Sequence, residues 1–521
     1  MLLAAMALAL AVVQTPVKKV LVIGIDGCRP DALIAAKTPN IDSLVADGAW
    51  SIAKADPITV SGPCWSSILC GVWDDKHGVK DNGFAGSDYK DYPDFLTLLK
   101  RHRPNLRTVA ITAWKPIIDN VIKSADYKGP LEPGDDAVVQ QALYELDRNS
   151  PDVMFLHFDD VDHAGHTYGF DPKNEDYLAS IEATDERIGA VLDGVRQRAT
   201  YETEDWLIIV VSDHGGSGTS HGQNIPEHVN VPFIVSGRDA AAFTIVPDQT
   251  DVAPTVFAFL GIKPGPEVDW DGVPVGLKGI DSKALEQASE DGTVKFGAKD
   301  DFFIGATDVP LSVRTEGAEI RTTTDGSVPG PHSPAVQSVH VEDGAVTIRA
   351  RAFMGGQPVG PSSMRTFRSQ KALYDSTEGS FSAGLLYRVL EGKFTSVDGL
   401  DFTRSTRGGI AATPTPNAAG SAEDFAIEFT GLVNANQDGV YDFALYSDDG
   451  ARLWIDGALV VDHDGLHSAS AAVGPVGLKK GWHRLRIVYF QAGGDMALRL
   501  AMGMRGTVLQ TVPVAGFAHA G

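Results

Sequence analysis

Short apolar runs alternate with amphipathic stretches over the first half of the chain. The apolar runs, predicted as buried strands, are residues 20–25, 108–112, 153–158, 207–211 and 233–236. Apolar positions in the stretches between them recur with a helical period, most clearly at residues 94–101, 137–148 and 176–199. Continuous apolar strands that alternate with amphipathic helices are typical of a parallel sheet covered by helices on both faces. The pattern therefore predicts an α/β domain, which we place at residues 17–280.

The pattern changes after this domain, because helical periodicity fades and Gly, Thr, Ser and Val become frequent. Residues 299–369 carry short alternating segments, such as 345–352, separated by Gly and Pro turns, and predict a small β-sandwich. Residues 372–521 predict a second all-β domain. Its clearest strands are residues 441–446, 452–455 and 482–490. The predicted fold is thus an α/β domain followed by two all-β sandwich domains.

The N-terminus is an apolar run, MLLAAMALALAVV, that is too short to span a bilayer. Small and polar residues and two lysines follow it, which is the order of a signal-peptide core and cleavage region, although no basic residue precedes the run. We predict that residues 1–15 are a signal peptide and that the protein is secreted, periplasmic or at the cell surface. The rest of the sequence predicts no membrane span.

The chain is strongly acidic, with 44 Lys and Arg against 68 Asp and Glu and a formal net charge of -24. A surface with this charge repels nucleic-acid backbones and anionic membranes, so a nucleic-acid polymer is excluded as a partner. A small anion that binds a local cationic centre remains compatible with the charge. The three cysteines, Cys28, Cys64 and Cys70, are too few for a disulfide framework. We expect them to be small buried residues, with one bridge or a reactive thiol as the alternatives.

Residue types that bind metals gather where three of the predicted strands end. They are Asp26 after the first strand, Asp162 and His166 after the third, and Asp213, His214 and His221 after the fourth. The carboxyl ends of parallel strands form the crevice in which open α/β sheets bind ligands. Asp162 and His166 are four residues apart, which places both side chains on one side of a helical turn. Each residue alone is equally explained as a cap or turn, but the gathering at three strand ends predicts a metal site.

These residues lie in segments that resemble the alkaline phosphatase superfamily and, within it, the nucleotide pyrophosphatase/phosphodiesterase branch. The matching segments are IDGCRPD at 25–31, TPNIDSL at 38–44, the block 59–82, DVDHAGH at 160–166 and SDHGGSGTSHG at 212–222. The resemblance implies an alkaline-phosphatase-like fold. It also implies a hydrolase of phosphate diesters or nucleotide pyrophosphates that acts through a covalent phosphoserine, with a small phosphoester as substrate.

The resemblance further implies two zinc sites, with other divalent ions as the alternative. Asp26, Asp213 and His214 would hold one ion, and Asp162, His166 and His221 the other. Nitrogen and carboxylate ligands, three to each ion, leave open positions for substrate and water. A bound zinc ion lowers the pKa of a hydroxyl enough for it to attack phosphorus as an alkoxide.

Ser61, in ITVSGPCWSSILCG, is the nucleophile that the resemblance implies, and it would also contact the first zinc ion. Asn82 falls at the spacing where this branch holds a phosphoryl oxygen with an asparagine. The backbone N–H of Gly62 and the first amides of a helix starting near Pro63 are expected to bind the remaining oxygens. Thr59 competes for the nucleophile's role, but the register with Pro63 and Asn82 favours Ser61.

The sequence departs from the pattern of the branch in two places. Only six residues separate His214 from His221, where larger members carry an insertion. Residues 62–65, Gly-Pro-Cys-Trp, replace the aromatic-Pro-Asn-His sequence that often follows the nucleophile. The pocket wall that selects the leaving group is therefore expected to differ from that of such members.

Two alternative functions remain open. The first is a sulfatase-like or phosphomonoester hydrolase of the same fold. For a sulfatase, however, Ser61 replaces the oxidisable Cys, Trp65 replaces the expected Arg, and a single calcium site would leave His166 and His221 unexplained. The second is a carbohydrate-binding surface protein whose hydrolase domain is inactive, against which the complete set of ligands and the nucleophile argue.

The C-terminal half resembles two other modules. Residues 320–369 resemble the small sandwich at the C-terminal end of chitobiase-like glycosidases, which implies a spacer. Residues 373–516 resemble the protective-antigen β-sandwich domain, which implies attachment to a glycan. Asp448 and Asp449 stand where some relatives hold Ca²⁺, but a tight turn with Gly450 at positive φ is favoured over a calcium site.

Overall fold

The computed structural model describes residues 16–130, 133–421, 423–467, 469–494 and 496–520. The predicted signal peptide lies outside the described residues. The chain forms two compact units, the first made of Met1–Phe296, Leu311–Gln337 and Ile348–Arg365, and the second of Gly297–Pro310, Ser338–Thr347 and Thr366–Gly521. The segment predicted as a small sandwich contributes to both units, and the predicted domain boundaries stay a prediction.

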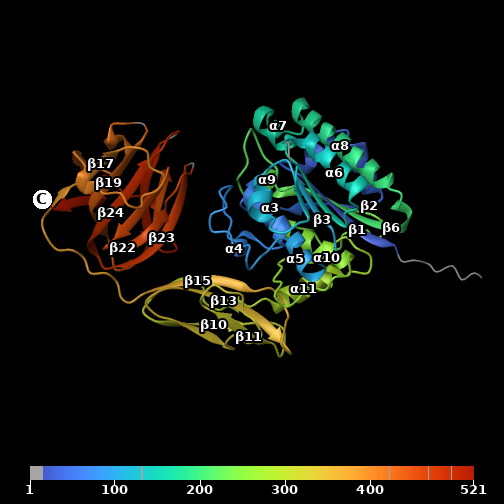
Figure 1. Ribbon diagram of the computed structural model, residues 1–521. Helices are drawn as coiled ribbons and strands as arrows, with labels where there is room; N and C mark the ends of the chain where they lie inside the picture. The colour runs from blue at the N-terminus through green and yellow to red at the C-terminus, as the bar shows by residue number, and fades with distance from the viewer. Residues whose placement is uncertain (1–15, 131–132, 422, 468, 495, 521) are drawn as a thin grey trace, which may run out of the picture. The chain divides into compact units, whose positions relative to one another are not determined.

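A seven-stranded sheet forms the centre of the first unit, with the order β2-β7-β6-β1-β5-β3-β4 (Figure 1). Its strands are β1 (Val17–Ile25), β2 (Gly48–Lys54), β3 (Thr108–Thr112), β4 (Tyr127–Gly129), β5 (Val153–Phe158), β6 (Glu204–Val211) and β7 (Asn230–Ser236). All five predicted strands are present, and β1, β3, β4, β5 and β6 pair in parallel. The pattern did not predict β2, which is mostly half-buried or exposed, or β4, which has three residues.

Strand β7 is antiparallel to both of its neighbours, β6 and β2, so the sheet is mixed at this edge. The connection from β6 to β7 contains only the four-residue helix α9 (Pro226–Val229). A parallel neighbour needs a long crossover, whereas this short connection returns the chain at the same end of the sheet. The loop that carries His221 therefore stays at the carboxyl end of β6.

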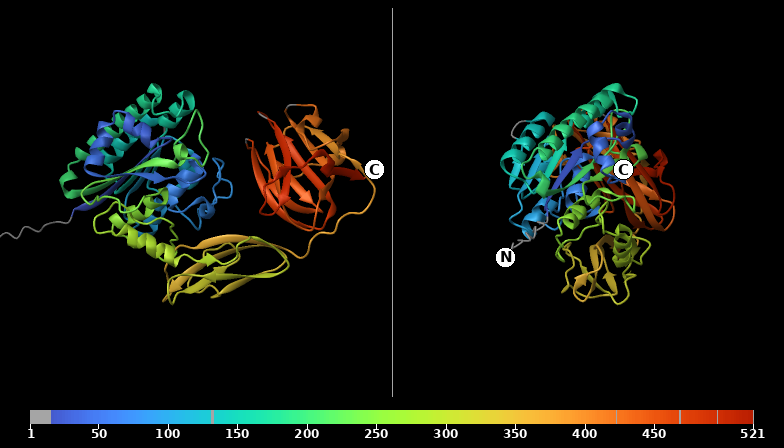
Figure 2. Two further views of the ribbon diagram at one scale, coloured as in Figure 1. Left: turned by 180° about the vertical axis from the view of Figure 1, so that it is seen from behind. Right: turned by 90° about the vertical axis from the view of Figure 1, so that its right-hand side faces the viewer.

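Helices cover both faces of the sheet (Figures 1 and 2). They are α1 (Pro30–Ala35), α2 (Pro39–Ala46), α3 (Ser61–Cys70), α4 (Asp74–His77), α5 (Phe95–His102), α6 (Asp135–Arg148), α7 (Asp160–Tyr168), α8 (Glu175–Arg196), α10 (Val252–Phe259) and α11 (Ser282–Gly292). The predicted helices at 94–101, 137–148 and 176–199 correspond to α5, α6 and α8. Successive side chains of β1 point to opposite faces, so Val20 and Val22 join one core while Leu21 and Ile23 join the other.

The middle segment consists of short strands, as its alternating pattern predicts. They are β8 (Lys295–Phe296), β9 (Phe302–Ile304), β10 (Thr307–Ser312), β11 (Glu319–Thr323), β12 (Ser338–Val341), β13 (Gly344–Met354), β14 (Gln357–Pro358) and β15 (Ser363–Gln370). They form a sheet of order β12-β10-β8 and another of order β11-β13-β15-β9, with β14 beside β13.

The C-terminal segment is also all-β, which confirms the prediction. Its strands are β16 (Phe381–Ala383), β17 (Leu385–Glu391), β18 (Arg407–Ala411), β19 (Phe425–Ala435), β20 (Gly439–Asp448), β21 (Ala451–Ile455), β22 (Ala458–His463), β23 (Ser470–Leu478), β24 (Gly481–Gln491), β25 (Ala497–Met504), β26 (Gln510–Thr511) and β27 (Phe517–Ala520). One sheet contains β16-β27-β19-β24-β21-β22 with β17 and β18, and the other is β23-β20-β25-β26. Phe429, Phe443 and Ile487 are fully buried in their common core.

The turn after β20 differs from the expectation in one respect. Gly450 is not among the glycines with positive φ, and the peptide bond between Asp448 and Asp449 is cis. Asp449 Oδ2 accepts a hydrogen bond from the backbone N–H of Ala492 at 2.9 Å, which agrees with a carboxylate that caps backbone groups.

The three cysteines are free and buried. Burial raises the pKa of the Cys28 thiol well above its usual range, with the charge of Asp213 as the next cause. These observations confirm small buried residues rather than a bridge or a reactive thiol.

In the part of the chain that the structure describes, no helix combines the length and the apolar character needed to cross a membrane.

Candidate metal centre

The six predicted ligands come together as two groups at the carboxyl ends of β1, β5 and β6. The first group is Asp26, Asp213 and His214, and the second is Asp162, His166 and His221. Within each group, the candidate ligand atoms lie within 4.8 Å of one another. The grouping is the one that the resemblance implies. Binding of a metal by these residues stays a prediction.

The first group is buried beside Ser61. His214 Nε2 lies 3.3 Å from Asp213 Oδ2 and 3.6 Å from Asp26 Oδ1. The same nitrogen lies 3.3 Å from Ser61 Oγ. The structure therefore places the predicted nucleophile against the first ligand group.

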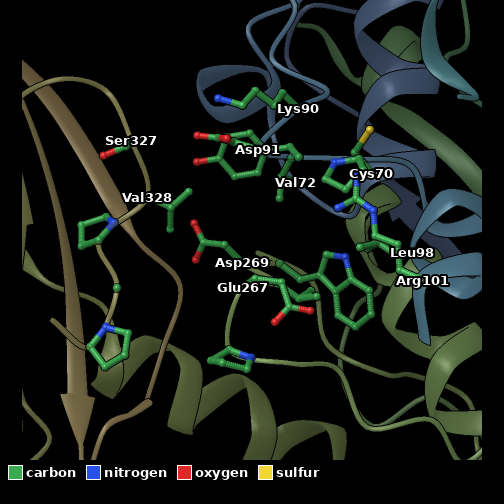
Figure 3. A pocket seen from close by; sticks show the side chains of 18 residues that line it. Cys70, Val72, Lys90, Asp91, Leu98, Arg101, Glu267, Asp269, Ser327 and Val328 are labelled. Carbon is green, nitrogen blue, oxygen red and sulfur yellow. The ribbon is translucent and has the colours of Figure 1, made fainter. Parts of the chain in front are cut away.

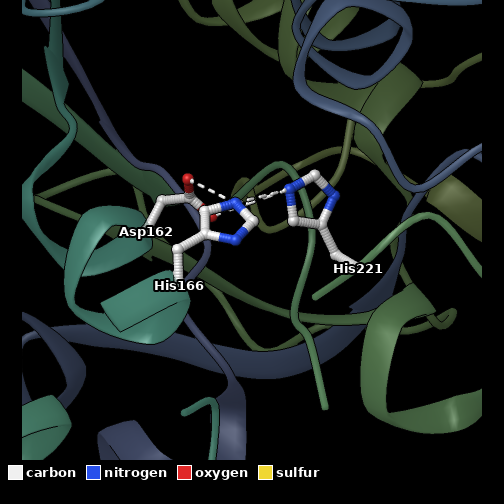
Figure 4. A group of neighbouring side chains, drawn as sticks. All are labelled: Asp162, His166 and His221. Atoms are coloured by element: carbon white, nitrogen blue, oxygen red, sulfur yellow. Dashed lines mark hydrogen bonds and ion pairs between the residues drawn. The ribbon is translucent and has the colours of Figure 1, made fainter. Parts of the chain in front are cut away.

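The side chains of the second group, Asp162, His166 and His221, point toward one another (Figure 4). His166 Nε2 lies 3.3 Å from Asp162 Oδ2 and 3.1 Å from His221 Nε2. The His166 side chain is 43% exposed, whereas that of Asp26 in the first group is 2% exposed. The rings of His214 and His221 stack with centroids 3.8 Å apart, so the two groups adjoin.

Each histidine in the two groups is oriented by a backbone carbonyl. Nδ1 of His166, His214 and His221 lies 2.8–2.9 Å from the carbonyl oxygens of Thr219, Gly215 and Thr59, respectively. A carbonyl only accepts hydrogen bonds, so Nδ1 carries the proton and Nε2 presents a lone pair. The close approach of two such nitrogens, those of His166 and His221, is then not a hydrogen bond. The lone pairs of these Nε2 atoms instead face the same space between the side chains. This arrangement is expected of metal ligands whose orientation is fixed by hydrogen bonds to surrounding groups.

One carboxylate oxygen of each aspartate accepts no hydrogen bond from the described residues. These atoms are Asp26 Oδ1, Asp162 Oδ1 and Asp213 Oδ2, and all three are buried. A buried carboxylate oxygen without a hydrogen bond or a cation is costly. Because these oxygens and the three Nε2 lone pairs converge, the donor set fits divalent cations with mixed nitrogen and oxygen ligands.

The remaining oxygens of the two fully buried aspartates are held in place. Asp26 Oδ2 accepts hydrogen bonds from Trp65 Nε1 at 2.8 Å and from His157 Nε2 at 3.1 Å. Asp213 Oδ1 accepts from the backbone N–H groups of Gly27 at 3.0 Å and His214 at 2.9 Å. Both carboxylates are thus fixed with their free oxygen toward the site.

The sequence analysis did not predict that Trp65 and His157 bind Asp26. His157 could have been noticed as the one polar residue in the otherwise apolar sequence of β5, where it pairs in register with Gly24 of β1. Trp65 lies over Gly24, where a Cβ atom would approach its ring to 2.3 Å. Asp26, His157 and Asp159 also form a third cluster of ligand types. We interpret His157 there as a hydrogen-bond donor, because its Nε2 is directed at Asp26 Oδ2.

The electrostatics of the site favour a cation. Burial raises the pKa of Asp162 to about 9, and the charges of Asp26 and Asp159 add to the rise. Burial likewise raises the pKa of Asp213 well above its usual range, with the charge of Asp26 as the next cause. Burial lowers the pKa of His214 to about 3, which keeps the imidazole neutral. The hydrogen bond from His157 and the neighbouring His214 instead lower the pKa of Asp26 despite its burial. Protein groups alone therefore leave the ionised carboxylates of Asp162 and Asp213 poorly compensated, and divalent ions would compensate them.

Ser61 is the first residue of α3, so the helix begins slightly before the predicted start near Pro63. The Gly62 N–H donates to Asn82 Oδ1 at 2.7 Å, which leaves the side-chain NH₂ of the exposed Asn82 as a donor. Gly62 is required here, because a Cβ atom would lie 2.6 Å from the carbonyl oxygen of Asp81. Since the Gly62 N–H already donates to Asn82, we infer that Gly62 orients the Asn82 side chain. Direct contact of the Gly62 N–H with a substrate oxygen stays a prediction.

Thr59, the competing nucleophile, is fully buried and engaged elsewhere. Its hydroxyl donates to the carbonyl of Gln223 at 3.0 Å and accepts from the N–H of Gly222 at 3.1 Å. Its own carbonyl is the partner of His221 Nδ1 at 2.8 Å. Thr59 therefore positions the loop that carries His221.

Replacing Thr59 by valine keeps the backbone carbonyl that orients His221 but removes both hydroxyl hydrogen bonds to the loop that carries it. Metal binding at the second group is expected to weaken by about 10-fold, the lower end of the cost of disturbing an outer shell. The variant keeps the side-chain shape but leaves Gly222 N–H and the Gln223 carbonyl unpaired. Competition with a chromogenic chelator measures the affinity. Thr184→Val is the matched control, since Thr184 is equally buried and its hydroxyl has no partner in the described structure. Equal affinities in the two variants would contradict this role of Thr59.

A cavity of about 400 Å³ lies away from these strand ends and is not the candidate site (Figure 3). Its lining includes Asp269 and Trp270 but none of the predicted site residues. The Asp269 carboxylate lies 3.3 Å from Lys76 Nζ and 3.4 Å from Arg351 Nε. We interpret this cluster as a buried ion-pair network that holds the first unit together.

Comparison with known proteins agrees with the geometry. Segments 20–129 and 102–243 match the family model of type I phosphodiesterase / nucleotide pyrophosphatase, and residues 382–509 match that of the PA14 domain. The α/β part thus resembles the nucleotide pyrophosphatase/phosphodiesterases, and the C-terminal part resembles PA14 domains. The resemblance of the middle segment to a chitobiase-type module stays a prediction.

Individual relatives are distant. Ectonucleotide pyrophosphatase/phosphodiesterase family member 7 of Rattus norvegicus is 21% identical over 229 residues, which are 38% of this chain and 49% of that protein. Bis(5'-adenosyl)-triphosphatase ENPP4 of Bos taurus is 25% identical over 218 residues, 38% of this chain and 47% of that protein. The chain thus spans about half the length of the curated relatives it matches. The solved structure of murine ectonucleotide pyrophosphatase/phosphodiesterase 5 aligns with a TM-score of 0.41 and 15% identity over 49% of this chain and 97% of that one.

Proposed function

We propose that this chain is an exported, metal-dependent hydrolase of phosphate diesters or nucleotide pyrophosphates that acts through a phosphoserine at Ser61. The observation that carries the proposal is the convergence of unpaired aspartate oxygens and histidine lone pairs beside a serine hydroxyl. Ser61 Oγ lies 3.3 Å from His214 Nε2, at the first of two adjoining ligand groups. The match of residues 20–243 to the phosphodiesterase family model supports the reaction class.

Different residues of the chain have different roles in the proposed reaction. Ser61 loses its hydroxyl proton to solvent, and its Oγ forms a bond to phosphorus as the bond from phosphorus to the leaving oxygen breaks; the alcohol or nucleoside phosphate departs and takes up a proton from solvent. The side-chain NH₂ of Asn82 and the N-terminus of α3 bind the non-bridging oxygens. Water then attacks the phosphorus of the phosphoserine, the bond from phosphorus to Oγ breaks, the phosphate monoester leaves, and a proton from the water restores the Ser61 hydroxyl. Two zinc ions, or other divalent ions, held by the two groups would supply Lewis-acid charge to the attacking and leaving oxygens.

The residues favour phosphate esters over sulfate esters. Ser61 occupies the place of the oxidisable cysteine of sulfatases, and Trp65, in the place of their arginine, holds Asp26 instead. Imidazole nitrogens such as those of His166 and His221 suit zinc better than calcium, which prefers oxygen ligands. For the C-terminal segment, the PA14 match supports attachment to a glycan, and a turn rather than a calcium site remains our interpretation of Asp448 and Asp449.

Turnover of a nitrophenyl phosphodiester is expected to require divalent metal. Treatment with a chelator should abolish it and zinc should restore it, because the ligand groups supply no positive charge of their own. Parallel assays with the phosphate monoester and the sulfate ester of nitrophenol define the preferred ester class, and we expect the diester to be the fastest. Absence of turnover of every ester by the zinc-loaded chain would favour the alternative of a carbohydrate-binding protein with an inactive hydrolase domain.

A further inference from the structure

Gln249 joins two segments that come together only in the fold. It is fully buried and begins the short 3-10 helix Gln249–Asp251. Its Oε1 accepts a hydrogen bond from the backbone N–H of Asp56 at 3.0 Å. Its Nε2 donates to the carbonyl of Ser212 at 3.2 Å and closely to the carbonyl of Asp213. One side chain thus connects the end of β6 to the segment that leads into α3.

The Asp56 side of this connection continues to the nucleophile helix. Asp56 Oδ1 accepts from the N–H of Ile58 at 2.9 Å, and Oδ2 accepts from Ser67 Oγ at 3.1 Å. Ser67 Oγ in turn accepts from His77 Nε2 at 3.0 Å, since His77 Nδ1 is occupied by the N–H of Val79. Burial lowers the pKa of His77 to about 3, so this histidine is a neutral donor. The turn before Ser61 and the middle of α3 are therefore fixed to Asp56.

The other side of the connection carries the first ligand group. Ser212 and Asp213 form the strand end from which His214 follows, and His214 Nε2 lies 3.3 Å from Ser61 Oγ. The distance between nucleophile and ligands thus depends on two segments far apart in sequence. Gln249 forms hydrogen bonds with the backbone of both segments and, among the residues that the structure describes, with none of the ligand side chains.

We propose that Gln249 is a positioning residue that sets the nucleophile Ser61 against the first ligand group. The inference rests on the proposed function and adds to it a residue that contacts neither substrate nor metal. A misplacement of about 1 Å between reacting groups can cost about 10²-fold in rate. Loss of the connection should therefore reduce the chemical step and leave substrate binding intact.

Gln249→Met tests the proposal, because methionine fills the space and makes no hydrogen bond to either segment. We expect kcat for the phosphodiester to fall about 10²-fold with KM within about twofold of wild type. Elemental analysis should still find two metal equivalents, and acid-quenched samples should show less phosphate on the Ser61 peptide by mass spectrometry. Gln249→Asn, which keeps the amide but is one methylene too short to reach both segments, should also lower kcat.

Gln370→Met is the matched control. Gln370 is a buried glutamine of the second unit whose Oε1 accepts from the N–H of Gly477 at 2.8 Å and whose Nε2 donates to the carbonyl of Gly477 at 2.8 Å. Its replacement should lower the melting temperature as Gln249→Met does, with kcat unchanged. If the wild type is active and either Gln249→Met or Gln249→Asn has a normal kcat, this inference alone is overturned. It is also overturned if either variant loses metal, or shows a raised KM instead of a lowered kcat. A zinc-loaded wild type without turnover would overturn the proposed function and this inference with it.

Discussion

Replacing Ser61 by alanine is expected to lower phosphodiester turnover by at least about three orders of magnitude, because the atom that bonds to phosphorus is removed. The zinc content should stay at two equivalents, since Asp26, Asp213 and His214 still supply ligands to the first ion. A residual rate above that of solution is expected from the charge and hydrogen bonds that remain. Steady-state kinetics with elemental analysis of the same sample measure both quantities.

A variant of Thr59, the alternative nucleophile, is the control for this experiment. Thr59→Val at saturating zinc should keep most of the turnover, because Thr59 acts on the His221 loop and not on phosphorus. Near-normal rates in Ser61→Ala together with a collapse in Thr59→Val would transfer the nucleophile's role to Thr59. Phosphate found on the peptide containing Ser61 after acid quench would agree with our assignment.

Replacing His166 by alanine is expected to remove one of the two metal equivalents and to lower turnover by more than about 100-fold. Mutation of a residue that only supports a metal ligand already lowers affinity or activity by up to about 100-fold, and loss of a ligand should cost more. Without the His166 imidazole, the second group retains only Asp162 and His221. Because the His166 side chain is 43% exposed, the variant should fold as the wild type does. Elemental analysis after gel filtration measures the stoichiometry.

His163→Ala provides the comparison on the same helix. His163 lies three residues before His166 in α7, is 69% exposed and faces Asp159 at 3.4 Å rather than the ligand groups. The variant should keep both metal equivalents and near-normal turnover. Unchanged metal content in His166→Ala, or equal losses in the two variants, would remove His166 from the ligand set.

Much of the site could be predicted because the relevant information is local. Buried strands appear as apolar runs, and in parallel strands their carboxyl ends share one edge, so Asp26, Asp162 and Asp213 were expected to meet. The four-residue spacing of Asp162 and His166 is likewise a property of one helix. The assignment of the six residues to two groups and the role of Ser61 came from the family resemblance rather than from spacing.

What the sequence did not reveal depends on contacts between distant segments. Trp65 and His157 meet Asp26 from different elements, and Thr59 meets His221 across more than a hundred residues. Taken singly, such residues have ordinary explanations as core or turn residues. The antiparallel direction of β7 follows from the short connection after β6, whereas strand patterns alone carry no direction. The departure from the family pattern at Trp65 also became interpretable only when its indole was found on Asp26.

The unequal exposure of the two ligand groups has a consequence for the proposed pair of ions. An ion at the first group would be enclosed by ligand side chains that are at most 2% exposed, whereas one at the second group would be reached past a histidine that is 43% exposed. Exchange of bound metal with the solvent would therefore begin at the second group, and a molecule that has lost one ion would keep the buried one beside Ser61. Binding of one further ion would then restore the pair.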